Sequence, residues 1–119
     1  MVQVQTLVKV GDNSGVKRIR CIKVMGKSKS YARIGQLIKA SVVSVGSNSK
    51  YKRGQVVNAI VIREAKFFSR DSCRVKFNQT AASLLNSSLE PIATRIFGPV
   101  PLEFNQWNPK VLNIAKNVT

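Results

Sequence analysis

The side chains of this sequence that could do chemistry are almost all cations. Twenty Lys and Arg stand against five Asp and Glu, and His is absent. A general acid–base pair therefore has very few candidate members, and a Ser nucleophile would have only Lys as its activating base. Cys21 and Cys73 lack the paired spacing of a zinc site, so we expect two buried or half-buried reduced thiols. The sequence argues against an enzyme and predicts no metal and no cofactor.

The positive charge is concentrated in the first two-thirds of the chain. Residues 1–76 hold 17 of the 20 Lys and Arg and carry a net +14 of the total +15. These charges alternate with Val, Ile and Leu in strand-like runs, which indicates a folded segment and not a basic tail. Because a dense positive surface attracts polyanions, we expect a folded domain that lies on nucleic acid.

Three basic sets are the candidate phosphate contacts, and because phosphate contacts carry no sequence information, recognition through them should rest on the shape of the nucleic acid. The sets are Lys17, Arg18, Arg20 and Lys23 on a strand; Lys27, Lys29 and Arg33 in a loop; and Lys50, Lys52 and Arg53 together with Lys66, Arg70, Arg74 and Lys76 of a hairpin.

Four aromatic side chains accompany these basic segments. Tyr31 and Tyr51 either stack on unpaired bases or pack to anchor their loops, and the sequence leaves both alternatives open. Phe67 and Phe68 are expected at an exposed hairpin tip, where large apolar side chains usually dock on a neighbour. We therefore favour contact of these two with a neighbouring protein or a nucleic-acid fold, the alternative being burial against the barrel.

The periodicity predicts a chain made mainly of short strands. Strands are expected over 2–10, 16–25 with a bulge near 20–22, 37–45 and 56–62, and a hairpin over about 64–77. The run 81–85 is ambiguous between strand and helix, Gly98-Pro99 should end a segment, and Asn108-Pro109 should begin a helix reaching Val118. This is a small β-barrel pattern with a helical appendage over 102–119. No stretch approaches the roughly 20 apolar residues of a membrane span, so no membrane partner is expected.

Several ordered stretches resemble the universal large-subunit ribosomal protein L-fourteen family. They are Gln5-Thr6, Asp12 to Gly15, Cys21 to Gly26, Tyr31-Ala32 with Gly35, Lys52 to Arg63 and Glu90 to Val100. The resemblance covers residues 1–101 and implies a mainly β fold: a small closed five-stranded β-barrel with a projecting β-hairpin and a short C-terminal helical region. It implies a structural, RNA-binding role in the large ribosomal subunit.

The resemblance also implies partners. These are large-subunit ribosomal RNA, neighbouring large-subunit proteins, small-subunit ribosomal RNA through an intersubunit bridge, and a silencing-type anti-association factor. Thr94 and Arg95 match the pair at which such factors dock; the alternative is a strand-end Thr and a surface Arg. Departures at Ser72, Asn78, Thr80 and Ser83 indicate a diverged member. We favour a ribosome of the mitochondrial matrix, with the bacterial cytoplasm and the plastid as alternatives.

Two other functions are weaker interpretations of the same residues. A free-standing module for single-stranded nucleic acid would carry stacking aromatics on a barrel face, whereas these aromatics lie in expected loops. A nuclease would need clustered carboxylates or His.

Overall fold

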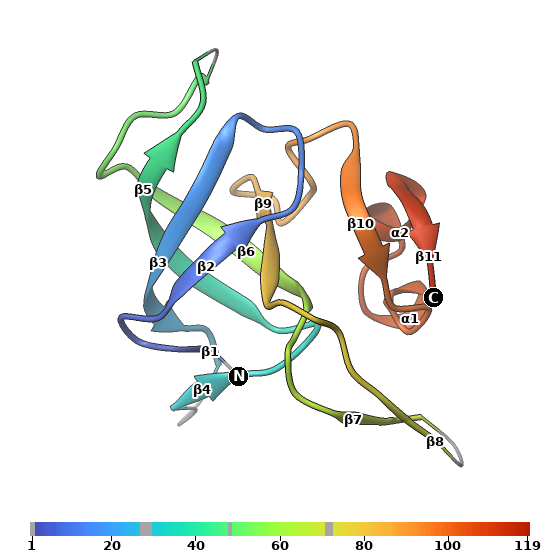
Figure 1. The fold of residues 1–119 in the computed structure, drawn as a ribbon. Coiled ribbons are helices and arrows are strands. Elements are labelled where there is room, and N and C mark those ends of the chain that lie inside the picture. The colour runs from blue at the N-terminus through green and yellow to red at the C-terminus, as the bar shows by residue number, and fades with distance from the viewer. Residues whose placement is uncertain (1, 27–29, 48, 71–72) are drawn as a thin grey trace.

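The computed structural model describes residues 2–26, 30–47, 49–70 and 73–119, except the side chains of Phe68 and Arg70. Five strands close into a barrel in the order β2-β3-β5-β6-β9 (Figure 1). Their bounds are β2 Leu7–Val10, β3 Val16–Val24, β5 Leu37–Val45, β6 Val56–Arg63 and β9 Ala81–Leu85. The closed five-stranded barrel confirms the predicted fold class. It closes through a short parallel pairing of β2 with β9, and the other four pairings are antiparallel.

β3 bends around the barrel through two irregular regions. Its register against β5 shifts on both sides of Arg18, between Val16 and Ile19, and again between Cys21 and Lys23. At each shift two consecutive side chains face solvent, first Lys17 with Arg18 and then Ile22 with Lys23. The second shift confirms the predicted bulge and shows how one strand presents so many cations while still burying Ile19 and Cys21 in the core.

β6 and β9 are buried on both faces. One face of each strand lines the barrel interior, with Ala59, Val61 and Leu84 in the first core cluster. The other face, with Ile62 and Leu85, packs beneath a second cluster from the C-terminal segment. All five residues of β9 are buried, so the ambiguous run 81–85 is a strand enclosed on both sides.

The C-terminal segment differs from the prediction in two places. It contains β10 Ile96–Val100, α1 Phe104–Trp107, α2 Pro109–Asn113 and β11 Ala115–Val118. Gly98 and Pro99 lie inside β10 and do not end it. The predicted helix begins at Pro109 but stops at Asn113, because the chain then runs parallel to β10 as β11 and the Ile96 N–H donates to the Ile114 carbonyl at 3.0 Å. Short apolar runs of this kind satisfy helix and strand periodicity equally.

The first expected strand is in fact two. β1 (Val2–Gln3) pairs with β4 (Tyr31–Ala32), whereas β2 begins only at Leu7. Between them Gln5 has a φ of 76°, a left-handed conformation that no strand accommodates. The prediction of one strand over 2–10 was wrong because a left-handed turn at a Gln leaves no Gly or Pro signal.

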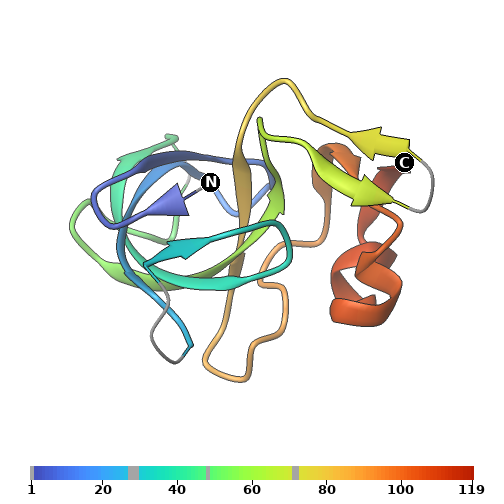
Figure 2. The same cartoon turned by 90° about the horizontal axis from the view of Figure 1, so that it is seen from below.

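The predicted hairpin is present. β7 (Phe68–Arg70) pairs with β8 (Cys73–Val75), and the ribbon projects from the barrel on the side away from the β5–β6 loop (Figures 1 and 2). Cys21 is buried, and burial raises the pKa of its thiol. Cys73 is exposed on the hairpin, which corrects the expectation of a buried or half-buried side chain.

Candidate nucleic-acid interface

Cations lie opposite one another on the outer surface of β2, β3 and β5. Lys9 is the cross-strand partner of Arg18, and Lys23 is the partner of Lys39. Arg20 lies opposite Leu7, two positions along from the first pair. All of these side chains are exposed. Directly opposed like charges destabilise a sheet, so this arrangement costs stability unless an anion lies over it.

The β5–β6 loop extends the same surface. Lys50, Lys52 and Arg53 are exposed, and the Arg53 Nε donates to the Val43 carbonyl at 3.1 Å. This bond lays Arg53 along β5, where it lines a shallow hollow together with Arg18. We call the exposed cations of these elements the barrel face: Lys9, Lys17, Arg18, Arg20, Lys23, Lys39, Lys50, Lys52 and Arg53.

Carboxylates do not neutralise the barrel face in the part of the chain that the structure describes. Asp12 and Glu64 are buried and bonded to internal partners. Glu90 pairs with Lys110 beside α2. The field of the barrel face is therefore directed at solvent, as a surface for a polyanion requires.

The hairpin cations are separated from those of the β5–β6 loop, so the structure divides the third predicted set. The loop and the hairpin lie on opposite sides of the barrel in both views (Figures 1 and 2). On the hairpin, the Arg74 guanidinium lies 4.9 Å and the Lys76 ammonium 5.3 Å from the centre of the Phe67 ring. Phe67 is 46% exposed, and these cation–π contacts hold it in a mixed basic and aromatic surface.

Arg33 has a structural partner. Its Nε lies 3.0 Å from the buried Glu64 carboxylate, and its Nη2 donates to the Phe67 carbonyl at 3.0 Å. Burial alone would raise the pKa of Glu64, but the hydrogen bonds and positive charges around it, including those of Arg33, lower that pKa below its ordinary value. Arg33 thus ties the base of the hairpin to the barrel, and its guanidinium is already engaged.

We expect Glu64→Gln to lower the free energy of unfolding by about 2–3 kcal/mol at pH 7. Breaking a buried ion pair costs about 3–5 kcal/mol, and we discount that figure because the Arg33 side chain is 32% exposed. Because the pKa of Glu64 is lower in the folded than in the unfolded protein, its ionised carboxylate stabilises the fold at pH values above the unfolded pKa of about 4.3. This stabilisation is lost as the pH falls through the folded-state pKa. Urea unfolding at pH 7 and near pH 3 should therefore show the deficit of the variant shrinking in acid.

The control for this change is Lys66→Gln, which alters a charge on an exposed side chain at the base of the same hairpin. It should change stability by less than about 0.5 kcal/mol. A deficit for Glu64→Gln that is equal at both pH values would contradict the ion-pair account.

Arg63 is a cation that the sequence reasoning did not select. Its Nη1 donates to the carbonyls of Phe97 and Pro99 at 3.0 and 3.1 Å, and burial lowers the pKa of its guanidinium. Gly98 has a φ of +82°, and a Cβ there would stand 3.0 Å from the guanidinium nitrogens. Arg63 therefore fastens β10 to the barrel.

The turn at Asp12 also joins the barrel to the C-terminal segment. Asp12 accepts from the N–H and hydroxyl of Ser14 within the turn, and in addition from the Ser83 hydroxyl and the Leu84 N–H. The Asn13 side chain then accepts from the N–H groups of Thr94 and Arg95 and donates to the Thr94 hydroxyl at 2.9 Å. Thr94 and Arg95 are exposed and are held in place from the barrel.

The two tyrosines differ in exposure. Tyr51 is half-buried against the barrel core, and burial together with the charge of Asp12 raises its pKa. Tyr31 is exposed on β4. Packing therefore accounts for Tyr51, and Tyr31 is the one of the two whose ring is accessible to a base. Lys27, Lys29 and the side chains of Phe68 and Arg70 lie outside the described residues.

Lys9 and Lys39 complete the barrel face and were missed. Both alternate with buried residues, Lys9 after Val8 and Lys39 between Ile38 and Ala40, so period-two alternation places them on the outer surface. Among the described residues no group of three His, Cys, Asp or Glu side chains could hold a metal ion. Neither of the two short helices in that part of the chain is long enough to cross a bilayer.

One comparison with known protein families bears on this site. The family model described as ribosomal protein L14p/L23e matches residues 1–119, the full length of the sequence.

Proposed function

Because the chain belongs to the ribosomal protein L14p/L23e family, which makes it a structural protein of the large ribosomal subunit, we propose that it binds large-subunit ribosomal RNA through the barrel face. The observation that carries this proposal is the set of opposed cations Lys9–Arg18 and Lys23–Lys39, which have no described carboxylate beside them. Phosphates would relieve that repulsion, and the closed barrel fixes the spacing of the contacts.

The hairpin and the segment around Thr94 would serve other partners. The Phe67 ring between Arg74 and Lys76 suits a neighbouring ribosomal protein or an RNA fold. Thr94 and Arg95, exposed and held by Asn13, would receive a silencing-type anti-association factor. A contact with small-subunit ribosomal RNA would complete an intersubunit bridge, and we favour the mitochondrial matrix as the compartment.

Sedimentation tests the proposal. A lysate is run on a sucrose gradient at moderate and then at high salt, and the fractions are probed for this chain. We expect it to migrate with large subunits and whole ribosomes and to remain there through the high-salt wash. Recovery only in light fractions, or release at modest salt, would overturn the assignment to the large subunit.

The number of phosphate contacts is measured separately, with purified protein and a ribosomal RNA fragment. If about 6 to 8 cations of the barrel face engage phosphates, log K should fall with log salt at a slope of about −5 to −7 on duplex, and less steeply on single strands. A slope near −2 would mean that most of these side chains are only solvated surface charges.

A further inference from the structure

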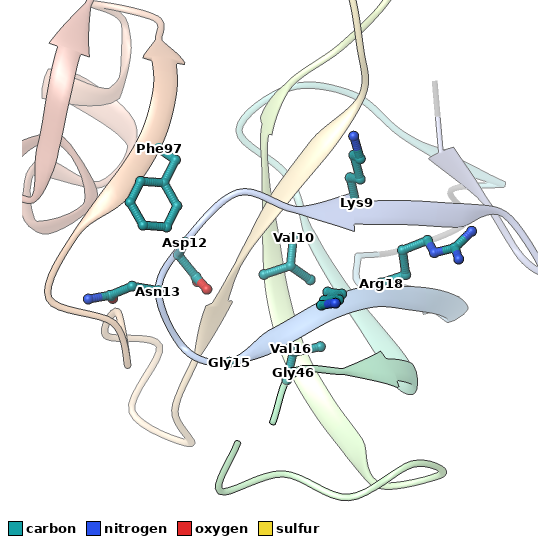
Figure 3. A pocket seen from close by; sticks show the side chains of 10 residues that line it. Lys9, Val10, Asp12, Asn13, Gly15, Val16, Arg18, Gly46 and Phe97 are labelled. Carbon is teal, nitrogen blue, oxygen red and sulfur yellow. The ribbon is translucent and has the colours of Figure 1, made fainter. Parts of the chain in front are cut away.

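An open pocket of about 570 Å³ lies between the β2–β3 turn, the start of β3 and β10 (Figure 3). We call it the turn pocket, and its lining includes Val10, Asp12, Val16, Arg18 and Phe97. We propose that this turn pocket receives one unstacked nucleotide of the bound RNA, with the base against the Phe97 ring and a phosphate on the cations opposite. The inference rests on the proposed function and adds a defined contact to it. Three features support it: an accessible aromatic ring, an apolar floor and a positive rim.

Phe97 is exposed but its backbone is fixed. Its side chain is 51% exposed, although it is one of the largest apolar groups of the C-terminal segment. Its N–H donates to the Gly11 carbonyl at 2.7 Å, and its carbonyl accepts from Arg63. The main chain that carries the ring is therefore fixed, so a base that stacks on the ring does not have to order the backbone of β10. Stacking on an aromatic side chain is the usual means of holding an unpaired base.

The floor of the turn pocket is mostly apolar. Val10 and Val16 lie between Phe97 and the cations in Figure 3. Gly15 and Gly46 present only backbone there, and the Gly46 N–H donates to the Gly15 carbonyl at 2.7 Å. Such an uncharged floor suits the face of a base better than a charged side chain would.

The polar groups beside the floor are already engaged. The Asp12 carboxylate accepts four hydrogen bonds from within the protein, and the Asn13 amide is bonded to Thr94 and Arg95. Reading the edge of a base would need free donors or acceptors there. The turn pocket should therefore take any base by stacking, without selecting its identity.

The rim supplies the charge for the phosphate. Lys9, Lys17 and Arg18 all line the turn pocket, and Lys9 and Arg18 lie across it from Phe97 (Figure 3). An acidic protein segment would match this charge but would leave the exposed ring and the apolar floor without a partner. The combination favours a nucleotide, which has an anion and a π face together.

The test uses the full chain and two anions of matched charge, an oligouridylate of about 12 nucleotides and inorganic polyphosphate. Phe97→Ala should weaken oligouridylate binding by at least about fivefold and leave polyphosphate binding unchanged. Phe97→Trp should restore the affinity. Leu102→Ala is the matched control, because Leu102 is 56% exposed and does not line the turn pocket. On irradiation, an oligomer that contains 5-iodouridine should form its crosslink at Phe97.

The outcomes separate this inference from the proposed function. If Phe97→Ala binds oligouridylate as tightly as the wild type, with the salt dependence intact, the turn pocket is not a nucleotide site while RNA binding stands. Crosslinks confined to other residues would likewise overturn the inference and leave an acidic protein segment as the occupant. If the wild type binds no RNA even at low salt, the proposed function itself fails.

Discussion

Asp12→Ala should lower the free energy of unfolding by about 3–5 kcal/mol, a large part of the 5–15 kcal/mol typical of a domain. Asp12 is only 6% exposed, and its Oδ2 accepts from the Ser83 hydroxyl and the Leu84 N–H at 3.0 and 2.9 Å. Without the carboxylate both donors remain buried and unbonded, at about 1–3 kcal/mol each. The bonds to Ser14 are lost as well. Urea unfolding followed by circular dichroism measures the change.

Ser14→Ala is the matched control at the same turn. It removes one donor to Asp12 from a half-buried position and should cost about 1 kcal/mol. Asp12→Asn keeps one acceptor oxygen and should fall between the two. Equal losses for Asp12→Ala and Ser14→Ala would show that the link from the turn to β9 contributes nothing.

Replacing Lys9, Arg18 and Arg20 together by Gln should weaken ribosomal RNA binding on the order of 100-fold at 0.15 M salt. A slope of −0.9 per phosphate contact corresponds to roughly fivefold in affinity for each contact at that salt concentration. The three side chains are neighbours across β2 and β3, so the change removes the positive charge from the centre of the barrel face. The magnitude of the log K against log salt slope should fall by about 2.7. Filter binding over a salt series measures both quantities.

The same triple variant should be at least as stable as the wild type. All three side chains are exposed, and removing them relieves repulsion between opposed cations. A loss of affinity with no loss of stability separates a binding role from a structural one. The matched control replaces Arg95, Lys110 and Lys116 by Gln, an equal loss of charge in the C-terminal segment. If it weakens RNA binding as much as the first variant does, net charge and not the barrel face is responsible.

The strands that alternation specifies were predictable to within a residue or two. β5 mixes apolar with small and polar residues, β6 carries a nearly continuous apolar run, and the bulge in β3 was visible as a change of phase in its apolar pattern. The failures depend on contacts between distant segments. Gln5 turns left-handed so that β1 can pair with β4, and residues 115–118 become a strand because β10 lies beside them. The local propensity of these residues predicts neither the turn at Gln5 nor the strand over 115–118.

The site was predictable as a set of cations but not as a division of roles among them. Charge density pointed to Arg18 and Arg20, and stricter use of alternation would have added Lys9 and Lys39. Nothing in the sequence separates these from Arg33 and Arg63, whose guanidinium groups are bonded to Glu64 and to β10. That distinction exists only once residues about 30 positions apart are brought into contact.

The pairing of β2 with β9 also determines how late in synthesis the barrel can close. Asp12, in the turn that follows β2, and Leu84 of β9 are hydrogen-bonded and lie 72 residues apart along the chain. At translation rates of about 5–20 residues per second, the ribosome takes roughly 4 to 14 s to reach one from the other. During that interval β3, β5 and β6 are able to pair as a meander, but β6 lacks its neighbour and keeps an apolar edge open to other chains. The nascent chain is then highly cationic and incompletely folded, which makes early capture by RNA or a chaperone an advantage before the last strand arrives.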